Sequence, residues 1–554
     1  MATPEIKLPR GSDVSEELST EGDVEKSEER NDVRSRPDAQ TPIVYKYLTF
    51  ETELPSPTSW QSQKNGVLNP PEPPDLRNLI SPFTWSESRK TYTTWLSSAV
   101  TALTAMTAGS YAAASDQLME EWDISQVAFN VGITTFTTGF ATAPMVLAPF
   151  SELNGRKPVF VVTGTLFVIC QLCCGLTQSY GGMLAARFFC GVGGSTFSTM
   201  VGGVVSDIYQ TEDRNTPMAL FSGAALFGTG LGPLFAGFVA QNVSWRWVFY
   251  VQAIFDALII LLVAVSFKET RGSVLLSRRA KALNNWYAAM EEAGYIGFSL
   301  HIEGEINKKS ERIRWKVKAD EERESLAKMI GISVFRPFHL LSTEPVVFFF
   351  SLWVAFSWAV LYLTFSSIPL VFSTNHSFTL QQTGAVFSAM CVGATLSALL
   401  SIYQEKVARH YGKMSATPEG RLYFSCIESA LMPIGLFWFG WTSFPAVHWI
   451  LPTLAIACAT MGIFSIYLAV FNYLADTYHR YASSALAAQS FCRNMLGGIF
   501  PLVADQMFNT MTYQGASSFL GGVGALLTLV PWVLVFFGPR IRARSRFASE
   551  IMDL

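Results

Sequence analysis

Long apolar runs alternate with short polar breaks from residue 92 to residue 537. A membrane-spanning helix needs about 20 mostly apolar residues. Twelve runs have that length, six before a long polar stretch and six after it. They cover residues 92–114, 127–150, 158–177, 181–206, 217–240, 246–266, 346–372, 381–402, 422–442, 446–474, 483–508 and 516–537. The pattern predicts an all-α membrane protein with twelve transmembrane helices in two six-helix bundles.

The polar segments complete the domain plan. Residues 1–90 are acidic and rich in Pro and Ser, and they have no amino-terminal apolar core of the kind that a signal peptide carries. We expect a disordered cytosolic tail there. The polar stretch 267–344 is expected to be a cytosolic central loop between two bundles at 91–266 and 345–538. Residues 539–554 form a basic cytosolic tail.

Composition supports lipid as the surrounding medium. Charged residues make up 15% of the chain and hydrophobic residues 50%, whereas soluble domains carry about 25% charged residues. The net charge of −3 gives no basic excess for nucleic acid. All eight cysteines lie in apolar runs, so we expect small buried side chains and not a disulfide framework. We expect no metal and no cofactor.

Lys and Arg gather in the loops on one side of the predicted membrane. The other side has almost no cations; Arg246 is the only one near it. This asymmetry predicts that both termini and the central loop are cytosolic, with the plasma membrane as the expected location. Two Asn-x-Ser sequons, at Asn242 and Asn375, fall in predicted outward loops and are the candidate glycosylation sites.

The loop after the second run has a charge pattern of its own. It places Glu152 before a tight turn at Gly155, and Arg156 and Lys157 follow that turn. Such a cluster can pair charges between helix ends and hold one conformation. The alternative is that the cations only anchor the loop on the cytosolic side.

Ionisable residues inside the runs are the candidates for proton coupling. A charge at the centre of a spanning helix costs about 3 kcal/mol to insert, so Arg187 should face a partner or a wet cavity unless it reaches the interface. Asp256 and Asp505 are carboxyl groups that can take up and release protons. The alternative for Asp505 is an ion pair with Arg493. The residues expected to line a substrate cavity are Trp358, Tyr362, Glu428, Asn472 and Arg493.

The fifth run is rich in glycine. Gly228, Gly232 and Gly237 would allow close approach of helix backbones, and Pro233 removes one backbone hydrogen bond and permits a kink. The alternative is simple tight packing without any part in a conformational change.

These segments resemble the motifs of the major facilitator superfamily. The loop at 148–157 is similar to G-x-x-x-D/E-x-x-G-R-K/R, with Ala148 and Leu153 as departures. The segment from Arg187 to Ser195 resembles an element of proton-coupled facilitators, and Gly228 to Gly237 resembles G-P-x-x-G-P-x-x-G-G of drug:proton antiporters. The resemblance, to fungal twelve-helix antiporters, implies the major facilitator fold, a proton-coupling role for Arg187, and export.

The leading hypothesis is therefore a proton-coupled exporter of drugs, toxins or a secondary metabolite, and not an enzyme. A phosphate-binding G-x-x-x-x-G-K-[ST] loop is missing from the sequence, which argues against ATP-driven transport. The alternatives are a polyamine exporter, an uptake symporter, a non-transporting membrane receptor and a membrane-bound acyltransferase. The expected partners are a small-molecule substrate, protons and the lipid bilayer, with the protein as a monomer.

Overall fold

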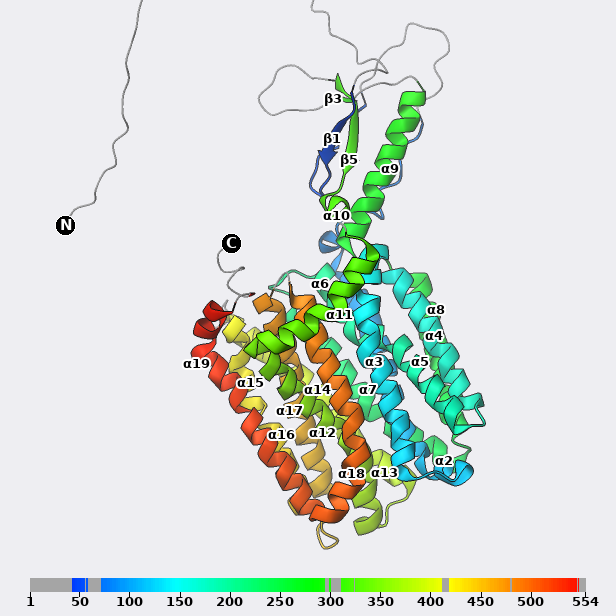
Figure 1. Cartoon of the computed structure of the whole chain (residues 1–554), viewed down its shortest axis with the longest axis vertical. Coiled ribbons are helices and arrows are strands. Elements are labelled where there is room, and N and C mark those ends of the chain that lie inside the picture. The colour runs from blue at the N-terminus through cyan, green and yellow to red at the C-terminus, as the bar shows by residue number, and fades with distance from the viewer. Residues whose placement is uncertain are drawn as a thin grey trace, which may run out of the picture.

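The computed structural model describes residues 42–54, 56–57, 71–293, 298–299, 310–322, 324–410, 418–478, 481–545 and 547. Most of these residues are helical, and the long helices run side by side as one bundle (Figure 1). Ten helical runs within the described part are long and apolar enough to cross a membrane. The all-α membrane fold predicted from the sequence is confirmed.

The first half of the bundle contains six long helical segments. They are α1 (Glu87–Ser110), α3 (Gln126–Asn154), α4 (Arg156–Leu176), α5 (Tyr180–Thr199) with its continuation α6 (Val201–Ile208), α7 (Asn215–Asn242) and α8 (Arg246–Ser266). The short helix α2 (Ser115–Trp122) follows the 3-10 turn η2 (Tyr111–Ala114). The first predicted run, 92–114, corresponds to α1 together with η2 and begins earlier, at Glu87, because polar residues before the apolar run continue the backbone hydrogen bonding of the helix.

The second half also crosses the membrane six times, but its helices are interrupted more often. Its elements are α12 (Pro345–His376), α13 (Leu380–Val386) with α14 (Ser388–His410), the turn η3 (Pro418–Leu422), α15 (Tyr423–Glu428) with α16 (Leu431–Thr442), α17 (Ile450–Tyr478), α18 (Ala482–Leu527) and α19 (Leu529–Arg544). The backbone of α18 leaves helical geometry at Thr512, with φ 65° and ψ 164°. This kink divides the 62-residue run Ala482–Ala543 into two crossings. With α1 included, the described bundle has twelve membrane crossings.

The central segment is more ordered than a loop. It contains α9 (Gly272–Glu292), the strands β3 (Phe298–Ser299), β4 (Ser310–Glu311) and β5 (Ile313–Lys316), the turn α10 (Lys318–Glu321) and α11 (Leu326–Thr343). Figure 1 shows α9 and the strands standing off one end of the bundle. We call this end the central-segment end and the other the opposite end.

Part of the predicted disordered tail belongs to this unit, which corrects the prediction for that stretch. Strand β1 (Val44–Tyr47) pairs in parallel with β5, and the two-residue strand β2 (Ser56–Pro57) pairs with β3. The side chain of Leu48 packs with Tyr287, Ile313 and Trp315 in a small separate core. Long-range pairing of this kind depends on a partner more than 260 residues away, which local composition does not reveal.

Charge pairs fix both β5 and the opposite end of the bundle. Burial alone would raise the pKa of Glu291, but hydrogen bonds from Arg312 and Arg314 outweigh it and hold that pKa below its usual range. At the opposite end, Arg246 donates to both carboxylate oxygens of Glu121, at 2.7 and 3.0 Å, and lowers the pKa of that group. This pair ties α2 to the start of α8.

The two halves touch near both ends of the bundle. At the central-segment end, Glu405 of α14 accepts a hydrogen bond from Asn215 of α7 at 3.0 Å. At the opposite end, the backbone N–H of Gln381 donates to the side chain of Gln241 at 2.6 Å. Helix α7 packs against α13 and α14, helix α3 packs against α18, and α11 touches both α3 and α18. These contacts define the seam between the halves.

Candidate transport site between the two halves

Arg187 lies fully inside the first half, with none of its surface exposed. Its Nε donates to the carbonyl oxygen of Gly132 at 3.2 Å and its Nη1 to that of Thr107 at 3.3 Å. The guanidinium also lies over the rings of Tyr111 and Phe136, 4.3 and 4.6 Å from their centroids. Arg187 therefore does not reach the membrane surface. It joins α5 to α1 and α3 and makes no ion pair within the described part of the chain.

A second buried guanidinium lies in the other half. Arg493 of α18 is 1% exposed and lies over the rings of Trp358, at 4.4 Å, and Tyr467, at 4.8 Å. Tyr362, one turn along α12 from Trp358, lies against α18 close to Arg493, because a methyl group on Gly497 would lie 3.4 Å from its ring. Three of the five residues expected to line the cavity, Trp358, Tyr362 and Arg493, thus come together. We call these three and Tyr467 the Arg493 cluster.

The other expected cavity residues lie elsewhere. Asn472 donates to the side chain of Asn215 at 3.1 Å, so it belongs to the contact between the halves at the central-segment end. Glu428 accepts a hydrogen bond of 2.5 Å from Gln404, between α15 and α14.

The ion pair of Arg493 with Asp505 is not formed in the described structure. The two residues are twelve positions apart on one helix, which separates them by about 18 Å along its axis. Asp505 is half-buried.

Asp256 is a buried carboxyl group without a bonded partner. It is 2% exposed, and its side chain makes no hydrogen bond or ion pair with any described residue. One turn earlier on α8, Gln252 accepts a hydrogen bond of 2.5 Å from Gln171 of α4. The Cys190 thiol donates to the same Gln171 at 3.3 Å. A polar chain therefore links α4, α5 and α8 one helical turn from the Asp256 carboxyl.

One side of α7 is packed against α1 of its own half. A methyl group on Gly228 would overlap the carbonyl oxygen of Ala102, and one on Gly232 would overlap that of Met106. Neither backbone oxygen can move without displacing the helix. Gly228 and Gly232 are therefore needed for packing within the first half, which is the simpler of the two roles considered for this motif.

The other side of α7 faces the second half. A methyl group on Gly230 would lie 2.8 Å from Cβ of Met390, and one on Gly237 would lie 2.9 Å from the carbonyl oxygen of Leu380. Gly384 of α13 approaches α7 in the same way, because a methyl group there would lie 2.9 Å from the carbonyl oxygen of Pro233. The seam at the opposite end is thus a close contact of two glycine-bearing backbones.

The charged loop after α3 takes part in an ion-pair cluster, which we call the latch. Its members differ from the residues expected from the sequence. Asp207 of α6 binds Arg156 through Nε at 3.2 Å and Arg271 through Nη1 at 3.3 Å. Arg156 also donates to the Ser151 hydroxyl at 2.8 Å. The side chains of Glu152 and Lys157 form no hydrogen bond or ion pair with the described residues. Of the three charged residues singled out in this loop, Arg156 alone uses its side chain.

Glu269 is the second acidic residue of the latch. Its carboxylate accepts backbone N–H groups of Arg156 at 2.8 Å and Lys157 at 3.3 Å, at the first turn of α4. A carboxylate at a helix amino terminus satisfies donors that have no partner in the helix. Gly155 is needed beside it, because its φ is +99° and a methyl group there would overlap the carboxylate.

Asp207 is marked in the sequence by its position relative to the motif loop. This aspartate ends an apolar stretch, as Asp256 interrupts one, and the motif loop with its two cations lies at the same end of the bundle. A carboxylate at the edge of an apolar run beside a cationic loop is a candidate latch partner on electrostatic grounds.

Residues 95–501 match the sequence profile of the Major Facilitator Superfamily. The chain belongs to this superfamily of transporters. The resemblance seen in the three motifs is confirmed, and with it the major facilitator fold.

Several fungal transporters are similar to this chain over most of their length. The transporter paaT of Penicillium rubens is 31% identical over 84% of this chain and 82% of its own. The efflux pump atB of Aspergillus terreus is 33% identical over 74% of this chain and 84% of its own. The multidrug transporter mdrA of Aspergillus fumigatus is 31% identical over 86% of this chain and 75% of its own.

Solved structures show the same fold at low sequence identity. The proton:xylose symporter XylE has a TM-score of 0.57 with 13% identity, and the match covers 81% of this chain and 97% of that one. At this identity the likeness concerns the fold alone. Helices α1 to α8 are the first six-helix half of this facilitator and α12 to α19 the second.

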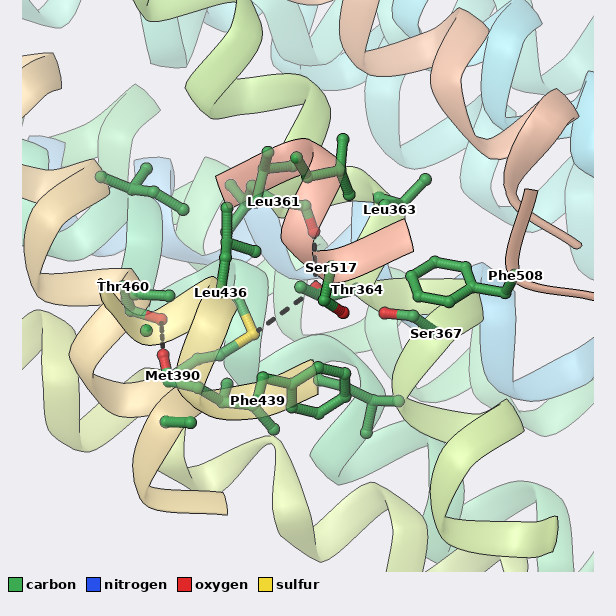
Figure 2. A pocket seen from close by; sticks show the side chains of 18 residues that line it. Leu361, Leu363, Thr364, Ser367, Met390, Leu436, Phe439, Thr460, Phe508 and Ser517 are labelled. Carbon is green, nitrogen blue, oxygen red and sulfur yellow. Dashed lines mark hydrogen bonds between the residues drawn. The ribbon is translucent and has the colours of Figure 1, made fainter. Parts of the chain in front are cut away.

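A cavity inside the second half of this facilitator is too small for an organic substrate. Figure 2 shows it between α12, α14, α16, α17 and α18, with Thr364 beside the sulfur of Met390. It offers about 30 Å³, enough for one or a few water molecules, since one water needs roughly 10–15 Å³. Its lining is mainly apolar and does not include the Arg493 cluster.

Both sequons of this facilitator lie at the opposite end. Asn242 is exposed at the end of α7, and its amide donates to the carbonyl oxygen of Phe238 at 2.8 Å. Asn375 is half-buried, and its amide donates to the carbonyl oxygen of Ser443 at 2.6 Å. Of the two amides, that of Asn242 is the more accessible to a glycosylating enzyme.

Replacing Asp207 with asparagine is expected to weaken the latch strongly. The change leaves Arg156, which is 7% exposed, without its ionic partner, and breaking a buried pair from one side costs about 3 kcal/mol. Glu87→Gln is the matched control, because the Glu87 side chain is 80% exposed and its pair with Lys90 contributes roughly 0.5 kcal/mol or less. The measurement is the apparent Tm of the purified protein in detergent. Equal Tm values for the two variants would contradict the latch.

Proposed function

We propose that this facilitator is a proton-coupled exporter that moves small organic compounds through the seam between its halves. The observation that carries the proposal is the two-sided packing of α7, with Gly228 against its own half and Gly237 against the other. A helix that is tightly packed on one side and meets the other half through glycine can change the seam without repacking its own half. Relatives named as efflux pumps support export as the direction.

Proton coupling is the expected energy source. The membrane potential supplies about 2.3 kcal/mol per elementary charge for each 100 mV. Asp256 can hold and release a proton, since it is buried and has no bonded partner among the described residues. Asp505 is the second candidate, and Arg187 is the charge between the helices of the first half that can respond to a change in proton occupancy.

The remaining parts of the proposal concern placement and partners. We place the protein in the plasma membrane as a monomer surrounded by lipid, with both termini and the central-segment end in the cytosol. The cations Arg156, Lys157 and Arg271 lie at that end, as the positive-inside rule requires. The sequons at Asn242 and Asn375 would then face outward. Proteolysis of intact cells and of inside-out vesicles tests this orientation.

Transport in inside-out membrane vesicles tests the function. Three fluorescent probes are offered: neutral Nile red, cationic rhodamine 6G and anionic fluorescein. We expect at least one to accumulate when a proton gradient is imposed, and accumulation to stop when an uncoupler is added. Accumulation that survives the uncoupler would exclude proton coupling, and no accumulation of any probe would contradict export of such compounds.

Replacing Asp256 with asparagine is expected to remove the response to the proton gradient. The amide preserves the shape of the side chain but cannot exchange a proton at working pH. We expect accumulation to fall to the level of vesicles without the protein, while exchange of labelled for unlabelled probe without a gradient continues. Asp505→Asn is measured in parallel, because loss of coupling in that variant alone would assign the proton to Asp505. Normal coupling in both variants would exclude both residues.

A further inference from the structure

Arg493 carries a buried charge that the protein itself does not neutralise. Its Nε and Nη1 have no hydrogen-bond partner among the described residues, and its guanidinium is 1% exposed. A buried donor that is left unpaired loses its hydration without any compensating bond, and the cost is greater when the group is charged. The two rings hold the cation by its flat face, at 4.4 Å from Trp358 and 4.8 Å from Tyr467, so its N–H groups are left without partners.

No carboxylate of the described chain is bonded to this cation. Asp505 lies about 18 Å farther along the same helix, and Glu428 is bonded to Gln404 between α14 and α15. Asp256 belongs to α8, in the other half of the bundle. Arg187, the buried cation of the first half, also has no acidic partner in the described structure. Arg493 therefore gives the interior beside Trp358 and Tyr362 a positive charge that no bonded carboxylate balances.

The Arg493 cluster adjoins the seam. One turn after Arg493, the helix α18 meets α3 of the first half, where the Thr134 hydroxyl donates to the carbonyl oxygen of Gly498 at 2.7 Å. The ring of Phe221, from α7, lies 6.5 Å from that of Tyr467. A movement of the halves that separates α3 from α18, or α7 from α17, would open a path to the guanidinium.

We propose that the Arg493 cluster binds the carboxylate of a small organic anion whose flat or apolar body lies against the rings of Trp358, Tyr362 and Tyr467. A guanidinium forms strong charge-assisted hydrogen bonds with a carboxylate. The ligand would supply the missing negative charge together with acceptors for the two unpaired donors. This inference rests on the proposed transport function and names its substrate class. Polyamines are disfavoured, because they would bring further positive charge to a cationic site.

Binding to the purified full-length protein tests the inference without the need for transport. The probes are 1-naphthaleneacetate, its amide 1-naphthaleneacetamide and the cation 1-naphthylmethylamine, which share one ring system. We expect the carboxylate to bind at least about tenfold more tightly than the amide, the scale of one charge-assisted hydrogen bond, and the amine to bind weakest. The measurements are quenching of tryptophan fluorescence and the rise in apparent Tm.

The variant Arg493→Gln is expected to remove the preference for the carboxylate. Arg540→Gln is the matched control, because Arg540 is exposed at the end of α19 and should leave the preference unchanged. If Arg493→Gln does not fold, Arg493→Lys serves instead, and it should keep the preference while binding the carboxylate less tightly. Equal binding of carboxylate and amide by the unmodified protein would overturn the inference, and so would a preference retained in Arg493→Gln.

The outcome is separable from that of the proposed function. If Nile red still accumulates with the proton gradient while the carboxylate shows no preference, the anion site is wrong and the exporter stands. If the carboxylate is preferred and no probe is moved by the gradient, the binding site stands and the exporter is wrong.

Discussion

Replacing Arg187 with alanine is expected to abolish proton-driven accumulation while the amount of protein in the membrane stays close to normal. The change removes a charge that has no acidic partner in the described structure, so it also removes a desolvation cost and should not prevent insertion. What is lost is the cationic link between α5, α1 and α3, made through the Thr107 and Gly132 carbonyl oxygens. Accumulation of the transported probe in inside-out vesicles, measured from pH 6 to pH 8, provides the check.

Arg187→Lys separates charge from geometry. Lysine keeps the charge but lacks the planar fork that lies over Tyr111 and reaches two carbonyl oxygens at once. We expect it to retain a weak response to the gradient where alanine retains none. Arg540→Ala is the control for loss of an arginine as such. Full accumulation by Arg187→Ala, with a normal pH profile, would show that Arg187 only supports packing.

Replacing Gly237 with leucine is expected to stop the transport cycle without unfolding the protein. Even a methyl group there would lie 2.9 Å from the carbonyl oxygen of Leu380, and a leucine side chain must push α7 and α13 apart. Because this contact lies between the halves, the first half keeps its own packing. We expect transport to fall to background in vesicles that contain a normal amount of protein.

Labelling can show where the seam has opened. A cysteine placed at Gln381, whose backbone is bonded to Gln241, should react faster with an impermeant maleimide in Gly237→Leu than in the unmodified background. Gly522→Leu is the matched control, since Gly522 lies in a helix with open space around it. Gly228→Leu provides the contrast, because it faces α1 and should lower the amount of folded protein. Equal transport by the variants at 237 and 522 would show that the close contact at Gly237 is not needed for the transport cycle.

The central segment also changes how the two halves are connected. Strand β1 from the amino-terminal tail pairs with β5, and α11 touches both α3 and α18. The described residues of the polar stretch between the halves therefore form a folded unit with its own core around Tyr287 and Trp315. Its contacts with both halves lie at the end where the latch of Asp207 is found.

The sequence by itself determined the spanning helices, their division into two sixes and the family. These follow from the length of apolar runs and from short motifs, because a helix in lipid must satisfy its backbone within one segment. It also determined that Arg187 and Asp256 needed an explanation, since a charge inside an apolar run is costly wherever the run packs. The glycines of α7 were likewise visible as sites of close approach.

Only the tertiary structure decided which partners these residues meet. In a spanning helix almost every position is apolar, so the sequence does not show which face packs against a neighbour. Nothing local to Arg493 predicted that its guanidinium would lie between Trp358 and Tyr467 and not beside Asp505. The same holds for Asp207 and Arg271, which take the acidic and basic places expected of Glu152 and Lys157 in the latch. Such pairs are set by the packing of helices that are distant in the chain. The sequence of a single helix has no periodic pattern that reveals this packing.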